Sequence, residues 1–190
     1  MKRIILVGYM GSGKTTIGRQ LAMALGLEFY DLDWYIETRY HCTVAQVFAQ
    51  RGEDGFREME RNMLHEVAEF ENIVLSCGGG TPCFFDNMDY LNAQGDTIYL
   101  KATPQVLARH LRMGRVERPL IKGKNDEELL AYIEASLQTR EPFYSKAKHI
   151  VDVNLLDNHS KIQESVRLLC ETLGLPYPDN PKDKTSKYRN

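Results

Sequence analysis

Residues 6–18 read LVGYMGSGKTTIG and follow a charged start, MKR, and two isoleucines. Within this stretch, GYMGSGKT at 8–15 fits the pattern GxxxxGK[ST] of a phosphate-binding loop between a strand and a helix. The glycines allow backbone N–H groups to face a phosphate, and the positive end of the helix dipole faces the same point. Lys14 can then reach the β- and γ-phosphates, and the Thr15 hydroxyl can ligate Mg²⁺. A glycine-rich turn alone would not explain this lysine and threonine in register, so the stretch predicts a nucleoside triphosphate site.

Short apolar runs predict five strands. They lie in the stretches RIILVG (3–8), EFYDLD (28–33), NIVLSCGGGTP (72–82), DTIYLKATP (96–104) and HIVDV (149–153). Helical patterns occupy 14–26, 34–70 with a break near 50–55, 126–140 and 161–174. Strands that alternate with helices predict an α/β fold, in which a five-stranded parallel sheet lies between two helical layers. Ligands of such folds bind at the carboxyl ends of the strands, and here glycines and acids follow those ends.

Prolines, glycines and charge mark the other boundaries. A helix can begin at Pro104, and Pro142 is expected to end the preceding helix near Arg140. The polar, basic segment 109–126 contains two glycines and predicts a mobile loop. We expect one folded domain at 1–175. The tail at 176–190 has prolines and charge but no apolar period, so it is expected to be disordered.

Composition limits the classes of partner. Lys and Arg number 24 against 26 Asp and Glu, for a formal net charge of −2. This balance provides no overall field for nucleic acid or an acidic membrane, so anion binding must be local. The first apolar stretch is too short for a secretory signal, and no run has transmembrane length. The four cysteines lack metal or redox spacing, which predicts reduced thiols in a cytoplasmic protein.

Two carboxylates follow the second expected strand, in YDLDWY. Because residues i and i+2 of a strand share a face, Asp31 and Asp33 could point into one crevice. One of them could then hold the water shell of Mg²⁺, and the other could accept a proton from a hydroxyl acceptor. The alternative is that Asp31 or Asp33 caps the helix that begins at WYIETRY.

Three further segments each allow two interpretations. In FREMER, Arg57 and Glu60 are either an ordinary exposed ion pair or a unit in which Glu60 fixes Arg57 to bind a carboxylate. In SCGGGTP, Gly78–Gly80 either allow close backbone approach to a small polar ligand or form a loose loop. The segment RVERPLIKGK is either a solvated loop or a lid whose cations meet the triphosphate. Those cations are Arg115, Arg118, Lys122 and Lys124.

Taken together, these segments resemble the shikimate kinase family of phosphate-loop kinases. The matching pieces run in family order as GYMGSGKTT, DLD, FREMER, CGGG, RPL and TREPFY, and they cover about 2–173. The resemblance implies a three-layer α/β/α fold like that of nucleoside monophosphate kinases. It also implies Mg²⁺-dependent transfer of the ATP γ-phosphoryl group to the 3-hydroxyl of shikimate, as a step of aromatic amino acid biosynthesis.

The resemblance also implies roles for individual residues. ATP would bind Gly11, Ser12, Gly13, Lys14, Thr15, Thr16 and Arg118. Shikimate would bind Asp33, Arg57, Gly79, Gly80 and Arg140, with Glu60 orienting Arg57 and an apolar wall of Val44, Phe48 and Phe56. The catalytic residues would be Lys14, Asp33 and Arg118, and Mg²⁺ would bind Thr15 directly and Asp31 through water.

The same resemblance divides the chain into a substrate-binding helical region at about 33–62 and a lid at about 112–125. Thr81 and Pro82 depart from the small residue that often follows the glycines in the family, so they are expected to reshape that rim. Arg109 and Arg112 are both candidates for the contact with adenine, and the choice between them stays open.

Three other classes compete with this interpretation. A gluconate kinase would also phosphorylate a polyhydroxy acid, but Gly78–Gly80 and Arg57 favour a cyclic acid held at its carboxylate. A nucleotide-dependent switch would give no reason for Asp33, Arg57 and Arg140 together. A nucleic-acid-linked ATPase is disfavoured by the acidic balance and by the absence of an aromatic and basic stripe. The expected partners are therefore ATP and shikimate, without nucleic acid or membrane, and the expected state is a monomer.

Overall fold

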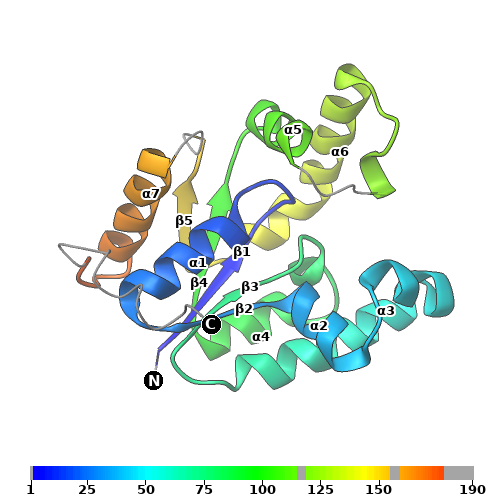
Figure 1. The fold of residues 1–190 in the computed structure, drawn as a ribbon. Coiled ribbons are helices and arrows are strands. Elements are labelled where there is room, and N and C mark those ends of the chain that lie inside the picture. Colours follow the sequence, from blue (N-terminus) through cyan, green and yellow to red (C-terminus); the bar gives the residue numbers. More distant parts are fainter. Residues whose placement is uncertain (1, 115–118, 155–158, 178–190) are drawn as a thin grey trace.

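The computed structural model describes residues 2–114, 119–154 and 159–177. Its strands form one parallel sheet of five strands in the order β2-β3-β1-β4-β5 (Figure 1). The strands are β1 (Arg3–Val7), β2 (Glu28–Asp31), β3 (Ile73–Ser76), β4 (Asp96–Lys101) and β5 (His149–Asp152). The predicted parallel sheet is thus confirmed.

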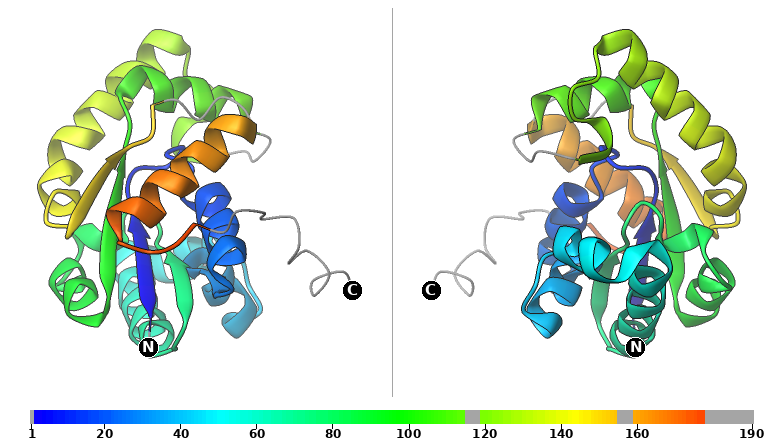
Figure 2. Two further views of the ribbon diagram at one scale, coloured as in Figure 1. Left: turned by 90° about the vertical axis from the view of Figure 1, so that its left-hand side faces the viewer. Right: turned by 90° about the vertical axis from the view of Figure 1, so that its right-hand side faces the viewer.

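Seven helices and two 3₁₀ turns accompany the sheet in the described part of the chain. The helices are α1 (Lys14–Leu25), α2 (Leu32–Tyr40), α3 (Val44–Ala68), α4 (Asn87–Gln94), α5 (Pro104–Met113), α6 (Asp126–Tyr144) and α7 (His159–Thr172), and the turns are η1 (Thr81–Cys83) and η2 (Pro119–Ile121). Helices α1 and α7 cover one face of the sheet, and α4 and α6 cover the other (Figure 2). The expected three layers are therefore present, and no helix among residues 2–114, 119–154 and 159–177 is long and apolar enough to cross a membrane.

The core forms where the central strands are covered on both sides. Ile4, Ile5 and the other residues of β1 up to Val7 have no exposed surface, as expected for a β-branched and aliphatic run in a parallel sheet. Helix α1 presents Ile17 and Leu21, four residues apart, to this sheet. Gly18 lets the helix approach closely, because a Cβ there would lie 2.6 Å from Cε2 of Phe29.

The strand order positions the ligand-binding edge. Strand β1 lies between β3 and β4, so the chain moves from β1 to one side of the sheet and later crosses back to the other. Loops that leave neighbouring strands in opposite directions at such a point open a crevice at the carboxyl edge. The loop after β1 occupies this position, and the loops after β2 and β3 lie beside it (Figure 1).

Several element boundaries differ from the expectations. Helix α2 begins at Leu32, so Asp33 lies in a first helical turn and not in a strand. Helix α4 was not expected, and α5 continues to Met113, where a mobile loop was expected from residue 109. Buried Leu107 and Leu111 hold α5 because they lie four residues apart on one helical face.

A helix break was expected near the glycines at 50–55, and a helix end was expected before Pro142. The break expected near 50–55 is confirmed at Gly52, whose φ of 69° and ψ of −173° interrupt α3. The end expected near Arg140 is wrong, because α6 continues through Pro142 to Tyr144. Pro142 removes one N–H group, but the last turn is retained by the bond from Ser145 N–H to the Glu141 carbonyl and by burial of Tyr144.

The carboxyl-terminal tail was expected to begin at residue 176. Tyr177 is partly buried, and its hydroxyl donates to Oε1 of Gln163 at 2.7 Å. The packed part of the chain therefore extends past the expected boundary by two residues. The expectation for 178–190 lies outside the described residues.

Candidate active site

The loop after β1 has a backbone that requires glycine. Gly8, Gly11 and Gly13 have φ values of 143°, 86° and 87°, in the region that side chains with a Cβ rarely adopt. Gly13 is also the N-cap of α1 and has no side chain to bond the first N–H groups of the helix. These N–H groups are therefore directed at the crevice, as an anion site at a helix N-terminus requires.

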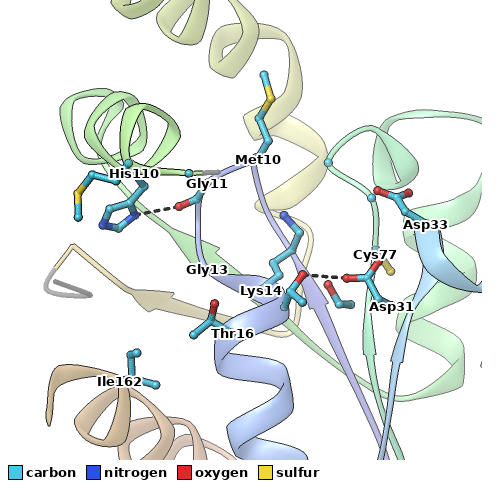
Figure 3. A pocket seen from close by; sticks show the side chains of 16 residues that line it. Met10, Gly11, Gly13, Lys14, Thr16, Asp31, Asp33, Cys77, His110 and Ile162 are labelled. Carbon is cyan, nitrogen blue, oxygen red and sulfur yellow. Dashed lines mark hydrogen bonds between the residues drawn. The ribbon is translucent and has the colours of Figure 1, made fainter. Parts of the chain in front are cut away.

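Lys14 crosses the opening of this loop. Its ammonium donates to the carbonyl oxygens of Gly8 at 2.8 Å and Tyr9 at 2.9 Å, and the residue is only 9% exposed. In Figure 3 the side chain points from α1 into the space between the loop and Asp33. A buried ammonium that donates to loop carbonyls can exchange these bonds for bonds to phosphate oxygens.

A cavity of about 440 Å³ lies at this edge of the sheet. Its lining comes from the loop after β1, the ends of β2 and β3, the first turns of α1 and α2, the last turn of α5, and Ile162 of α7 (Figure 3). The predicted residues in the lining are Gly11, Gly13, Lys14, Thr15, Thr16, Asp31, Asp33, Gly78 and Gly79. Ser12 is buried within the loop and is not part of this lining.

Thr15 and Asp31 form an oxygen pair at the foot of the cavity. The Thr15 hydroxyl donates to Oδ2 of Asp31 at 2.8 Å, and the Asp31 side chain makes no cap bond although Asp31 is the N-cap of α2. The capping interpretation is therefore wrong for Asp31. No group of three or more His, Cys, Asp or Glu in the described ranges could hold a metal. A hydroxyl and one carboxylate nevertheless suit Mg²⁺, which prefers oxygen ligands and takes the rest from phosphates and water.

Asp33 lies across the cavity from the phosphate loop (Figure 3). Burial raises the pKa of its carboxyl to about 6, and the negative charges of Asp31 and Glu60 act in the same direction. The Lys14 ammonium opposes this effect. At neutral pH the carboxylate is still ionised, and it is a stronger base than an ordinary aspartate.

Arg57 and Glu60 form a buried unit and not an exposed ion pair. Nη1 of Arg57 donates to Oε2 of Glu60 at 2.8 Å, and the two residues are 9% and 1% exposed. Nη2 of Arg57 donates to Oε1 of Glu53 at 3.2 Å, and the ring of Phe84 lies 3.9 Å from the guanidinium carbon. The expected apolar wall adjoins this unit, where Phe56 stacks on Phe48 with ring centres 4.4 Å apart.

The three glycines after β3 are needed because side chains approach their backbone. A Cβ on Gly80 would lie 2.7 Å from Nη2 of Arg57, and a Cβ on Gly78 would lie 3.0 Å from Oδ1 of Asp33. A Cβ on Gly79 would lie 3.3 Å from the backbone nitrogen of Met10. The loose-loop interpretation is therefore wrong: this segment packs between the phosphate loop and Arg57.

Arg140 reaches the same segment from α6. Its Nη1 donates to the carbonyl oxygen of Gly79 at 3.5 Å, and its guanidinium lies 5.5 Å from the centre of the Tyr9 ring. The Tyr144 hydroxyl donates to the same carbonyl. Arg57 and Arg140 thus border Gly79 and Gly80 from opposite elements, beside the cavity that contains Asp33.

The expected lid is described only in part. Arg115 and Arg118 lie outside the described residues. Arg112 is tied to the start of α6, where Nε donates to Oδ1 of Asp126 at 2.8 Å and Nη2 donates to the Lys124 carbonyl at 2.7 Å. The choice of adenine contact between Arg109 and Arg112 stays open.

Some residues at the site were not found by sequence reasoning. His110 contacts the Gly11 carbonyl through Nδ1 at 2.9 Å, and Phe84 covers Arg57. Trp34, the single tryptophan of the chain, follows Asp33 but does not line the cavity; it is 47% exposed and its ring lies 4.5 Å from the guanidinium carbon of Arg19. Neither His110 nor Phe84 belongs to a recognisable motif, because their role depends on contacts between distant segments.

Comparison with known proteins places this geometry in a family. The profile of the shikimate kinase family matches residues 10–173. A shikimate kinase of Phocaeicola vulgatus is 57% identical over 173 residues, which cover 91% of this chain and 99% of that relative. The chain belongs to the shikimate kinase family. As a member of this family it is an ATP-dependent phosphotransferase.

Solved structures of the shikimate kinase family share the fold. The crystal structure of the enzyme from Bacteroides thetaiotaomicron has a TM-score of 0.90 at 52% identity and covers 92% of this chain and 99% of its own. The shikimate kinase from Acinetobacter baumannii, solved in complex with shikimate, has a TM-score of 0.77 at 32% identity, with 92% and 94% covered. A gluconokinase from Sinorhizobium meliloti has a TM-score of 0.55 at 18% identity, and that likeness shows the fold alone.

Proposed function

We propose that this chain transfers the γ-phosphoryl group of ATP to the 3-hydroxyl of shikimate, with Mg²⁺, to give shikimate 3-phosphate and ADP in aromatic amino acid biosynthesis. One observation carries the proposal. Gly78–Gly80 separates a phosphate-binding loop on one side from a buried arginine unit on the other, with Asp33 beside both. A site with a triphosphate half, a carboxylate-binding half and a base between them fits a small hydroxylated acid as acceptor.

The acceptor half would work by positioning. Arg57 and Arg140 would bind the carboxylate of shikimate, and backbone N–H groups of Gly79 and Gly80 would assist. Asp33 would bind ring hydroxyls and accept the proton of the attacking 3-hydroxyl, for which its pKa of about 6 suits it. The oxygen then bonds to the γ-phosphorus as the bond to the leaving ADP oxygen breaks.

The donor half would neutralise charge. N–H groups of Gly11–Thr16, buried Ser12 among them, and the ammonium of Lys14 would surround the phosphates. Thr15 would hold Mg²⁺ directly and Asp31 through water. An ion held by these two residues would supply positive charge that offsets the negative charge of the phosphates. Arg118 would meet the triphosphate from the lid at about 112–125, as the acceptor binds the helical region at about 33–62.

The experiment is a coupled ADP-release assay with shikimate, gluconate or no acceptor, with Mg²⁺ and with excess chelator. We expect ADP release only when both shikimate and Mg²⁺ are present with ATP, and not with gluconate, without acceptor or with chelator. Turnover with gluconate would favour the gluconate kinase alternative, and equal ADP release without acceptor would favour a nucleotide-dependent switch. The monomeric state stays a prediction, which light scattering after size-exclusion chromatography would test. The cytoplasmic location also stays a prediction, which cell fractionation would test.

A further inference from the structure

Thr81 directly follows the three glycines and lies entirely inside the protein. It has no exposed surface, and its hydroxyl donates to Oε1 of Glu60 at 2.6 Å. Glu60 is itself 1% exposed. A carboxylate this deeply buried requires partners on its oxygens, because an unpaired buried charge is strongly disfavoured. The hydroxyl of Thr81 is therefore a structural partner of Glu60 and not a surface group.

The two oxygens of Glu60 serve different partners. Oε2 accepts from Nη1 of Arg57 at 2.8 Å, and Oε1 accepts from Thr81. Arginine and carboxylate commonly pair through two parallel hydrogen bonds, which use two guanidinium nitrogens. Here the bond from Thr81 holds Oε1 on a different partner, so that Glu60 takes only one nitrogen of Arg57. Nη2 donates to Oε1 of Glu53 at 3.2 Å, and the buried Nε has no hydrogen-bond partner among the described residues. Nε–H and the second N–H of each terminal nitrogen therefore remain for other acceptors.

Thr81 is held rigidly enough to impose this arrangement. Its backbone N–H donates to the Gly78 carbonyl at 3.2 Å, and its own carbonyl accepts from Nδ2 of buried Asn87 at 2.9 Å. The same segment continues to Phe84, whose ring lies 3.9 Å from the guanidinium carbon of Arg57. One short segment thus fixes both the carboxylate behind Arg57 and the aromatic face beside it.

We propose that Thr81 is a positioning residue for the acceptor site. By holding Oε1 of Glu60 away from Arg57, it favours a single bond between Glu60 and Arg57 and leaves guanidinium N–H groups for the carboxylate of the acceptor. Thr81 contacts neither substrate and acts only through Glu60 and Arg57. This role rests on the proposed function, because it presumes an acceptor with a carboxylate.

The test compares Thr81→Val, which removes the donor at similar volume, with Thr81→Ser, which keeps it. We expect Thr81→Val to raise the KM for shikimate about tenfold, the effect of losing a hydrogen bond to a charged group. Its kcat and its KM for ATP should stay within about twofold of the wild type, since Thr81 does not line the cavity that contains Lys14 and Asp33. Thr81→Ser should keep the KM for shikimate near that of the wild type. If the Thr81→Val variant does not fold, Thr81→Ala takes its place.

A double-mutant cycle with Arg57→Ala separates positioning from general support of the fold. If Thr81 acts through Arg57, Thr81→Val should change kcat/KM for shikimate by less than about twofold in the Arg57→Ala background. An unchanged KM in Thr81→Val, equal losses for serine and valine, or additive losses in the cycle would each overturn the role. Absence of shikimate turnover by the wild type would overturn the proposed function and this role together. If the wild type turns over shikimate normally, these outcomes test the role of Thr81 alone.

Discussion

Asp33 lies beside the phosphate loop and has a raised pKa. Because its pKa is raised to about 6 through burial and neighbouring negative charge, the carboxylate loses its basic form at a higher pH than most aspartates. We expect kcat/KM for shikimate to fall as the pH decreases through about 6. Asp33→Asn should lose roughly 10²–10⁴-fold in kcat. A pH–rate profile measures both; a flat profile from pH 5 to 7 would contradict the role of Asp33 as base.

The two arginines beside Gly79 and Gly80 should act on one substrate only. Truncating a charged partner of a bound carboxylate costs about 2–5 kcal/mol, or roughly 30-fold or more in affinity. We therefore expect Arg57→Ala and Arg140→Ala each to raise the KM for shikimate by at least that factor. Their KM for ATP should change little. Exposed Arg39→Ala is a matched control, and normal acceptor KM values in both variants would refute the carboxylate site.

At the scale of elements, the segment after β3 limits how Arg57 can lie. A Cβ on Gly80 would lie 2.7 Å from Nη2 of Arg57, so Gly80→Ala must displace the guanidinium, at a cost of about 1–3 kcal/mol. We expect a roughly tenfold higher KM for shikimate with an unchanged KM for ATP. In the Arg57→Ala background the same substitution should have little effect. Additive losses in steady-state kinetics would show that Gly80 acts independently of Arg57.

Sequence patterns predicted the elements well where local signals agreed with packing. The phosphate loop could be recognised because its spacing is fixed by the geometry of phosphate binding. Pro142 misled the prediction of α6, because burial of Tyr144 against the sheet outweighs one lost hydrogen bond. Asp31 and Asp33 do line one cavity, as expected, but through a helical turn and not through a shared strand face.

At the scale of the whole molecule, the order of the strands in the sheet could not be predicted from the sequence patterns, and this order places the loops of the site. Glycine and acid clusters at strand ends indicated one edge, but only the order β2-β3-β1-β4-β5 brings the loops after β1, β2 and β3 together. The contacts of Thr81 with Glu60 and of Phe84 with Arg57 join segments more than twenty residues apart. No single-sequence pattern encodes such pairs, since each residue alone is unremarkable in its segment.

Because both halves of the site belong to one sheet edge, each ligand should stabilise the whole fold. A ligand at about 100 times its Kd adds about 2.7 kcal/mol, roughly 5–10 °C in Tm for a chain of this size. We expect a non-hydrolysable ATP analogue with Mg²⁺ and shikimate each to raise the Tm in thermal unfolding. Lys14→Ala should lose only the nucleotide response and Arg57→Ala only the acceptor response. Loss of both responses in either variant would contradict two separate half-sites.

The tryptophan beside Asp33 has a practical consequence. It is the single indole in the chain, it is 47% exposed, and the guanidinium carbon of Arg19 lies 4.5 Å from its ring. Light emission from an indole responds to nearby charge and hydration, so the emission of this side chain reports on one exposed position of α2, next to Asp33 in the chain. Rapid mixing with a small acid, followed by indole emission, would therefore measure without any added dye how fast the surroundings of α2 respond to the acceptor.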